Sequence, residues 1–322
     1  MMRSLYSLLF LCSFLFSIEL DYTVENTNII TTNKQQTKDY NRVRLNLTLA
    51  GEKYENSILK LITDNENFYN KTEDSNTNNS SIYRGYFKYT DDKHLVSIGL
   101  QRIPFGVGRI WNPIDIFNPI DSTSIEPQNR EGVESIRYEY AIDSVSNLEL
   151  AYSKDETSFK IKSYLEFADF AAVAINDNKA NQDILGYEIE GEFLNSGIEL
   201  RSEGGYFKDK EFDENYYKYI LGGEYGFENS LTILGEYLYD NKNDLKNIGL
   251  NISYTITPLL NITALNIFNT DDKSYLLSTT LFYSLSDEML LSYGYFNYNS
   301  KDNNSQFSNI YNTHFLKLSI TF

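Results

Sequence analysis

The feature that most constrains this chain is an alternation of apolar and polar side chains with a period of two residues. From Ile248 to Ile256, every even-numbered residue is Ile, Leu or Tyr, whereas the odd-numbered residues are Gly, Asn, Ser and Thr. This period places alternate side chains on opposite faces, as in a β-strand with one apolar face. About 18 such segments follow one another, of which the first is the weakest. They lie near 22–30, 40–50, 54–63, 81–90, 93–101, 132–141, 146–153, 158–166, 169–176, 184–193, 197–207, 216–226, 231–239, 247–256, 259–269, 274–284, 288–298 and 312–322.

The connections between these segments alternate between short and long. The tight ones are 51–53, 91–92, 142–145, 195–196, 257–258 and 285–287. The longer, polar ones are 64–80, 102–131, 208–215, 240–246 and 299–311, with 154–157 as a shorter member of this set. A soluble sandwich has no reason to alternate in this way, whereas a transmembrane barrel has short turns on one side of the membrane and longer loops on the other.

Segment length also favours a membrane barrel. Strands of about 9–11 residues cross a bilayer when tilted, and these segments are too polar to face lipid on both sides. An open sheet edge in lipid would leave backbone groups without partners, so the sheet must close. The sequence therefore predicts an all-β fold, a transmembrane antiparallel β-barrel of about 18 strands, with 16 as the alternative, in one domain over 18–322.

Residues 1–17 have the composition of an export signal. Arg3 is followed by the apolar run 5–16, and polarity returns after Ser17. The run is shorter than the ~20 residues of a membrane-spanning helix, which is the alternative interpretation. We expect cleavage after Ser17. The mature chain then has no cysteine, because Cys12 is the only one, and this excludes disulfides, thiol nucleophiles and cysteine metal sites.

Composition narrows the class further. A formal net charge of −17 argues against nucleic-acid binding, which requires clustered Lys and Arg. The 27 tyrosines suit the aromatic belts of a membrane barrel. Tyr217 and Tyr225 share one face of a predicted strand, and in a tilted strand they would lie about 20 Å apart along the membrane normal.

The last segment carries a second membrane signature. Apolar residues or His occupy every second position up to the terminal Phe322. This ending resembles the assembly signal of bacterial outer-membrane barrels. The resemblance implies contact with the barrel-assembly machinery, and a place among the lipid and lipopolysaccharide of a Gram-negative outer membrane. Whether several copies form a homo-oligomer stays open.

Segment 102–131 breaks the pattern. It holds four of the five prolines and the only tryptophan, and it mixes apolar, aromatic and charged residues. A solvated loop would be less apolar, so we expect this segment to be partly buried. It follows the fifth strand on the side of the long connections, where porins place a loop that folds into the barrel.

The same segment resembles a stretch of uncharacterised porin-like proteins, with Gly-x-Gly-Arg, then Asn-Pro-x-Asp, Phe-Asn-Pro and Arg-x-Gly-Val. The matching residues are Gly106, Gly108, Arg109, Trp111, Asn112, Pro113, Asp115, Phe117, Asn118, Pro119, Arg130, Gly132 and Val133. The match covers about 30 residues and implies a porin-like channel without naming a solute.

These features predict a constriction in the channel. Prolines would restrict the loop, Trp111 and Phe117 would wedge against the inner wall, and arginines would pair with loop carboxylates. The alternatives are a structural plug or an outer loop packed on itself. The predicted constriction residues are Arg102, Arg109, Trp111, Asp115, Asp121, Glu126 and Arg130.

The polar face of the strands predicts two charged walls in the lumen. The basic wall is Arg42, Arg44, Lys60, Arg84 and Lys88, with no carboxylate expected beside them on that face. The acidic wall is Glu188, Glu190, Glu192, Glu199 and Glu203, relieved mainly by Arg201. Opposed walls would set a field across the lumen. The alternative is that these charges only hydrate a polar interior.

The sequence thus predicts a porin for small hydrophilic solutes or ions, without cofactor or metal. The first alternative is a structural anchor or adhesin barrel without an open channel, because 64–80 and 299–311 are rich in Asn, Ser and Asp. A barrel hydrolase is a minor alternative. It would need a histidine beside acids or a serine, and only His94 and His314 are present.

Overall fold

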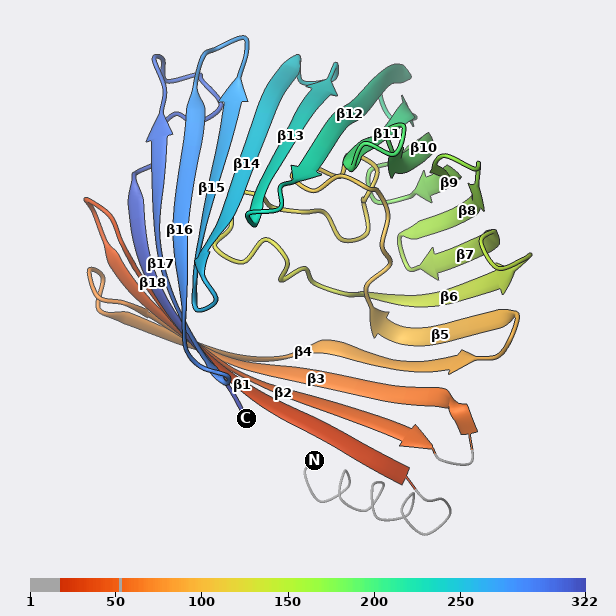
Figure 1. Cartoon of the computed structure of the whole chain (residues 1–322), viewed down its shortest axis with the longest axis horizontal. Helices are drawn as coiled ribbons and strands as arrows, with labels where there is room; N and C mark the ends of the chain where they lie inside the picture. Colours follow the sequence, from red (N-terminus) through yellow and green to blue (C-terminus); the bar gives the residue numbers. More distant parts are fainter. Residues whose placement is uncertain (1–17, 52–53) are drawn as a thin grey trace.

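The strands of this chain form one continuous antiparallel sheet (Figure 1). The computed structural model describes residues 18–51 and 54–322, so the expected export signal at 1–17 lies outside the described residues. Within these ranges no helix is long and apolar enough to cross a membrane. The strands are β1 (Ile18–Thr32), β2 (Thr37–Gly51), β3 (Tyr54–Asn70), β4 (Ser75–Thr90), β5 (His94–Gln101), β6 (Val133–Ala141), β7 (Asn147–Ser153), β8 (Glu156–Tyr164), β9 (Asp169–Asp177), β10 (Gln182–Glu192), β11 (Ile198–Asp209), β12 (Glu214–Gly226), β13 (Leu231–Asp240), β14 (Leu245–Thr257), β15 (Leu260–Asn269), β16 (Tyr275–Ser286), β17 (Met289–Asn299) and β18 (Thr313–Thr321).

The sheet closes on itself. Each strand pairs with its neighbours in sequence, and β1 also pairs with β18, from Glu25 opposite Thr321 to Thr32 opposite His314. The backbone N–H of Phe322 donates to the carbonyl oxygen of Val24 at 2.8 Å. Closure leaves no sheet edge at these two strands, as lipid requires. The predicted antiparallel barrel is therefore confirmed, with 18 strands in the described residues.

The two faces of the strands differ as the alternation predicts. Leu221 on β12 is 53% exposed on the outer face, whereas its neighbour Ile220 is fully buried inside. The outer face carries a broad band of exposed apolar side chains, which lipid would cover. It includes Leu200, Leu221, Ile248, Leu250, Leu281 and Leu316.

Aromatic side chains cluster near both ends of β12 on this outer face. Tyr217 and Tyr219 stack with a 6.5 Å centroid separation, and both contact Tyr239 on β13. Near the other end, Tyr225 meets the Phe227 ring edge-on at 4.6 Å. This arrangement matches the two interfacial belts of a membrane barrel.

The expected long connections are mostly wrong. The polar segment 64–80 is not a loop, because β3 runs to Asn70 and β4 starts at Ser75. The 208–215 connection similarly shrinks to a turn between Asp209 and Glu214. Backbone pairing does not depend on side-chain polarity, so antiparallel strands continue beyond the apolar band. Figure 1 shows β1–β4 as long arrows for this reason.

These tight turns are closed by Asp and Asn side chains. The Asp209 carboxylate accepts the backbone N–H groups of Glu211 at 3.0 Å and Phe212 at 3.2 Å. Asp213 then takes a φ of 51°, a conformation that Asn and Asp tolerate better than most residues. Polar residues that indicate loops in the sequence therefore build short hairpins here.

Two connections are long, and both turn inward. The 102–131 loop lies inside the ring of strands between β5 and β6 (Figure 1). In the 300–312 loop, Phe307 is buried and contacts Tyr298 with ring centroids 6.3 Å apart. It belongs to an interior apolar cluster with Phe296 and Phe315. The interior is therefore partly filled by chain rather than left as an open cylinder.

One glycine of β17 tests this interior packing. The Phe315 ring covers Gly294, and a Cβ at Gly294 would lie 2.0 Å from the ring's Cε1 atom. We expect Gly294→Val to lower the free energy of unfolding by about 1–3 kcal/mol, because the Phe315 ring that it would displace is buried and packs in the apolar cluster with Phe296. Urea unfolding of the refolded protein measures this. Gly235→Val is the matched control, since nothing lies within 4 Å of a Cβ there. An equal effect of the two variants would contradict the packing argument.

Candidate channel constriction

The first half of the 102–131 loop lies on an apolar patch of the inner wall. Ile103, Phe105, Ile114 and Phe117 are buried. They form one cluster with inward-facing residues of β7 and β9–β12: Ala151, Val173, Ile175, Ile184, Phe207 and Tyr216. Glycines on the wall allow this close approach, because a Cβ at Gly205 would lie 3.1 Å from Cγ2 of Ile114. An apolar patch inside a polar barrel thus fixes where the loop rests.

Three wall carboxylates accept hydrogen bonds from the loop backbone. Glu188 on β10 accepts the N–H of Gly106 at 2.8 Å. Glu203 on β11 and Glu236 on β13 take the N–H groups of the residues that follow. These contacts are Val107 at 2.5 Å and Gly108 at 2.9 Å to Glu203, then Arg109 at 2.6 Å, Ile110 at 2.9 Å and Trp111 at 3.2 Å to Glu236. Charged acceptors of this kind make strong hydrogen bonds.

The side chains of Arg109 and Trp111 leave this anchored turn in different directions. The Arg109 guanidinium donates to the Glu190 carboxylate at 2.8 Å and stays 49% exposed. The sequence analysis expected Arg109 to pair with a carboxylate of the loop, and this was wrong. Arg109 pairs with the wall because its own backbone is held against the acidic wall. Trp111 lies against β14, where a Cβ at Gly249 would be 2.8 Å from Cη2 of the indole.

The second half of the loop is anchored on a different part of the ring. Glu126 accepts two hydrogen bonds from Arg42 on β2, at 2.9 and 3.1 Å, and pairs with Lys317 on β18 at 2.6 Å. The loop therefore contacts β10–β14 at one end and β18 and β2 at the other, so it spans the interior. The Arg42 side chain is 2% exposed, so Glu126 compensates a buried charge.

The basic wall has carboxylates beside it, contrary to the sequence-based expectation. Arg44 makes a two-pronged contact with Asp64 on β3, at 2.7 and 2.6 Å, and Glu25 on β1 lies 3.5 Å from Arg42. The expectation was wrong because Asp64 was assigned to a loop and belongs to the extended β3. The alternation around Glu25 is weak, so the sequence did not predict that its side chain points into the barrel.

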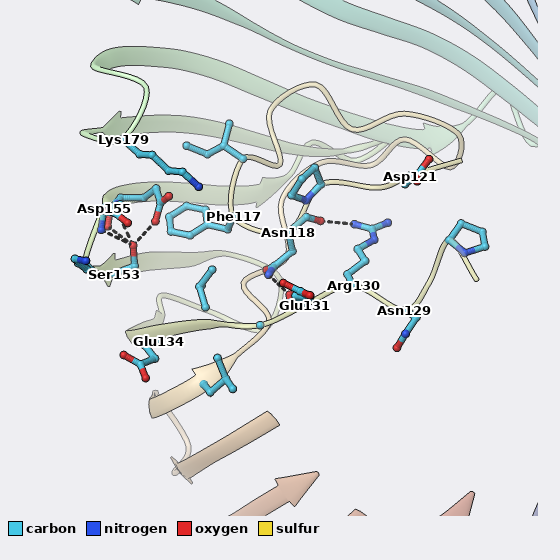
Figure 2. Close-up of a pocket in the computed structure, with 18 of the residues that line it drawn as sticks. Phe117, Asn118, Asp121, Asn129, Arg130, Glu131, Glu134, Ser153, Asp155 and Lys179 are labelled. Carbon is cyan, nitrogen blue, oxygen red and sulfur yellow. Dashed lines mark hydrogen bonds between the residues drawn. The ribbon is translucent and has the colours of Figure 1, made fainter. Parts of the chain in front are cut away.

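Contacts within the loop hold its middle, at 115–118, against its C-terminal end. Arg130 pairs with Asp115 at 3.1 Å. Arg130 also donates to the Asn118 carbonyl at 3.2 Å, and Asn118 Nδ2 donates to the Glu131 carbonyl at 2.6 Å (Figure 2). Burial raises the pKa of the Asp115 carboxyl to about 7, although an Asn118 N–H and Arg130 act against it. Asp121 only caps the loop locally, by accepting the Thr123 N–H at 2.9 Å.

Three cations of the basic wall and Arg102 of the loop have no ionic partner in the described residues. Within the described residues, no carboxylate lies within ion-pair distance of Lys60, Arg84, Lys88 or Arg102. All four line one cavity of about 260 Å³ with Gln101 and tyrosines of β4. Arg84 instead donates to the carbonyl of Arg130 at 2.5 Å. This side of the lumen is therefore strongly basic.

Three of the five predicted acidic-wall residues, Glu188, Glu190 and Glu199, have a cationic partner. Lys160 on β8 pairs with Glu188 at 2.6 Å. Arg201 contacts Glu190 at 3.2 Å, and it also contacts Glu199 and Glu224 at 3.0 Å each. Glu192 accepts the backbone N–H of Gly197 at the β10–β11 turn, at 2.7 Å. Most predicted acidic-wall residues thus hold other parts of the chain.

A second cavity of about 710 Å³ lies between the loop and the ends of β6–β9 (Figure 2). Phe117 and Asn118 form part of its lining, with Asp155 and Lys179 from the neighbouring turns. This cavity opens on the side of the barrel from which the 102–131 loop emerges.

Each histidine ring contacts a tyrosine hydroxyl on the neighbouring strand. The His94 ring contacts the Tyr138 hydroxyl at 2.8 Å, and Asp91 accepts the backbone N–H of His94 rather than a ring N–H. The His314 ring similarly contacts the Tyr293 hydroxyl at 2.8 Å. In the described part of the chain, no group of three His, Cys, Asp or Glu side chains is arranged to hold a metal ion.

Sequence reasoning missed three residues that anchor the loop or its wall. Glu236, Lys160 and Lys317 all lie on the polar face of their strands. Their alternation shows that they face inward, but nothing in the sequence shows that the loop reaches Glu236 or Lys317. Glycines in the strands, such as Gly205 and Gly249, were the available signal of a close backbone approach.

The Glu126 anchor makes a pH-dependent prediction. Burial opposes ionisation, but the Arg42 hydrogen bonds and Lys317 outweigh it and hold the pKa of Glu126 below its usual value of 4.5. Because the pKa of Glu126 is lower in the folded state, its ionised form stabilises the fold above pH 4.5. This contribution is lost as the pH falls through the folded-state pKa of Glu126. We expect Glu126→Gln to cost about 3 kcal/mol near neutral pH, because it leaves Arg42 poorly compensated.

The measurement is urea unfolding of both proteins across this acidic range. The difference between wild type and Glu126→Gln should shrink as the pH falls below 4.5. A constant difference at all pH values would show that Glu126 acts through packing alone.

Comparisons with known proteins agree on the fold. No protein-family model matches the chain, and no curated protein matches it in sequence. Among solved structures, Pseudomonas aeruginosa OccK5 (OpdH) has a TM-score of 0.67 at 9% identity, covering 95% of this chain and 98% of that one. OccD3 (OpdP) of the same organism has a TM-score of 0.65 at 11% identity, over 94% and 91%. A mutant Rh. blastica porin has a TM-score of 0.52 at 10% identity, over 94% and 100%. The chain has the fold of outer-membrane porin barrels.

Proposed function

We propose that this protein is an outer-membrane channel through which small hydrophilic solutes or ions diffuse passively. The observation that carries the proposal is the 102–131 loop, which is anchored across the interior of a closed barrel by Glu203 and Glu236 at one end and Arg42 at the other. A loop fixed in this way narrows the lumen without needing any catalytic group. Arg109 then sits half-exposed beside the remaining space.

The proposal includes a charge preference. In the described residues, Lys60, Arg84, Lys88 and Arg102 have no ionic partner and share one cavity. In the acidic wall, three carboxylates each contact a cation, and Glu203 is buried beneath the loop. Cations in a narrow, low-dielectric space raise the local concentration of anions. We therefore propose that the channel favours anions, although the whole chain is acidic.

Location and partners belong to the same proposal. The exposed apolar band suits lipid, and the predicted signal at 1–17 and the terminal Phe322 suit export and assembly into a Gram-negative outer membrane. Lipopolysaccharide would surround the rim. The tyrosine partners of both histidines support a protein that is not an enzyme. An assembly of several copies stays a hypothesis.

Planar-bilayer recordings test the channel directly. Purified protein should give discrete ion-conducting steps, and the reversal potential across a salt gradient should show a preference for anions. Purified protein that inserts without conducting steps would favour the structural anchor instead. A preference for cations would contradict the proposal that the cavity lined by Lys60, Arg84, Lys88 and Arg102 attracts anions.

Arg109 tests the constriction. We expect Arg109→Ala, or deletion of 106–121, to change the single-channel conductance and to shift the reversal potential, because both remove charge and bulk from the narrowed region. Lys154→Ala is a matched control, since it removes a cation that lines only the cavity at the mouth. Unaltered conductance and reversal potential in both 106–121 variants would remove the constriction claim.

A further inference from the structure

The channel leaves the Gly-x-Gly-Arg motif unexplained, and the structure offers a reason for it. Six consecutive backbone N–H groups, from Gly106 to Trp111, each donate to an oxygen of a wall carboxylate. The acceptors come from three strands, β10, β11 and β13. We call this set of contacts, between residues 106–111 and Glu188, Glu203 and Glu236, the amide clamp.

The two glycines of the motif are required by this geometry. Gly106 has a φ of +80°, and a Cβ there would lie 2.3 Å from Oε2 of Glu203. A Cβ at Gly108 would lie 1.8 Å from the carbonyl oxygen of Trp111. Only glycine permits these close approaches, to a wall carboxylate at Gly106 and to the loop's own backbone at Gly108. Successive N–H groups that converge in this way form a concave anion site.

Two of the carboxylates depend on the clamp for their compensation. Glu203 is fully buried and Glu236 is 2% exposed. Among the described residues neither lies within ion-pair distance of a cation, whereas Glu188 has Lys160 at 2.6 Å. A buried charge without a partner is costly. The N–H groups of the loop are therefore the main groups that satisfy Glu203 and Glu236.

We propose that Glu203 and Glu236 are the positioning residues of the constriction, which hold Arg109 and Trp111 in place through backbone N–H groups. The proposal rests on the proposed function only for its effect on conduction. The clamp fixes the loop by its main chain, so the half-exposed Arg109 side chain, which pairs with Glu190, is not needed to anchor the loop.

The chain provides its own reporter of loop position. Trp111 is the only tryptophan, and its backbone N–H donates to Glu236. Its indole packs against Gly249 on the wall. Release of the clamp would expose the indole to water, so its emission should shift to longer wavelength and iodide or acrylamide should quench it more strongly.

The central experiment compares two substitutions of similar size at one position. Glu236→Gln keeps one oxygen acceptor, whereas Glu236→Met keeps none. We expect Glu236→Met to shift the balance from docked to released loop by roughly 10- to 100-fold, as for losing a hydrogen bond to a charged acceptor. Glu236→Gln should lie between wild type and Glu236→Met. A residue that acts only through its volume would give equal effects.

Matched controls distinguish the effect of losing the clamp from the effects of losing a lumen charge and of misfolding. Glu224→Gln removes an inward carboxylate that bonds to Arg201 rather than to the loop, and it should leave Trp111 emission unchanged. Gly108→Ala changes only the loop, so the strands of the barrel stay intact, and it should release Trp111 as Glu236→Met does. The circular dichroism of the β-sheet checks that each variant is folded.

The outcomes are distinct for the two proposals. Folded Glu236→Met and Gly108→Ala proteins with wild-type emission and quenching would overturn the clamp, whatever the conductance. If Trp111 quenching increases but the single-channel conductance is unchanged, the clamp holds the loop in place but does not determine the constriction. A wild-type protein that does not conduct would reject the channel, while the fluorescence still decides whether the clamp exists.

Discussion

The structure depends on one constraint: a backbone in lipid must find all its hydrogen-bond partners within the protein. In the wall of the barrel, pairing between β1 and β18 supplies the hydrogen-bond partners that the backbone of these two strands would otherwise lack. The same constraint returns inside the barrel, where the 102–131 loop has no ladder of neighbouring strands. Its N–H groups are satisfied instead by Glu203 and Glu236, which in turn need those groups to compensate their buried charge. Wall and loop therefore stabilise each other.

The alternation of side chains was enough to predict the barrel. A period of two residues fixes which side chains share a face, so the exposed Leu221 and the buried Ile220 follow from their positions alone. Strand ends were less predictable. Asp64 looks like the start of a loop, yet it continues β3 and pairs with Arg44, because pairing of the backbone is indifferent to a polar side chain.

The candidate site could be predicted only as a segment. Prolines and the lone Trp111 marked 102–131 as unusual, but its partners lie on strands far away in sequence. Which wall a loop rests on is set by long-range fit, such as the space above Gly249 that the indole fills. No local pattern records this fit. Glu236 therefore escaped notice, although its inward direction was readable.

The loop also decides which charges remain available to a solute. Counting residues suggests opposed basic and acidic walls, but a lumen charge acts on a solute only if nothing else neutralises it. Glu188, Glu203 and Glu236 are engaged by Lys160 and the loop, whereas Lys60 and Lys88 have no ionic partner in the described residues. In the proposed channel, the acidic wall therefore mainly holds the loop, and Lys60 and Lys88 are the wall cations that act on the solute. A channel built from an acidic chain can favour anions for this reason.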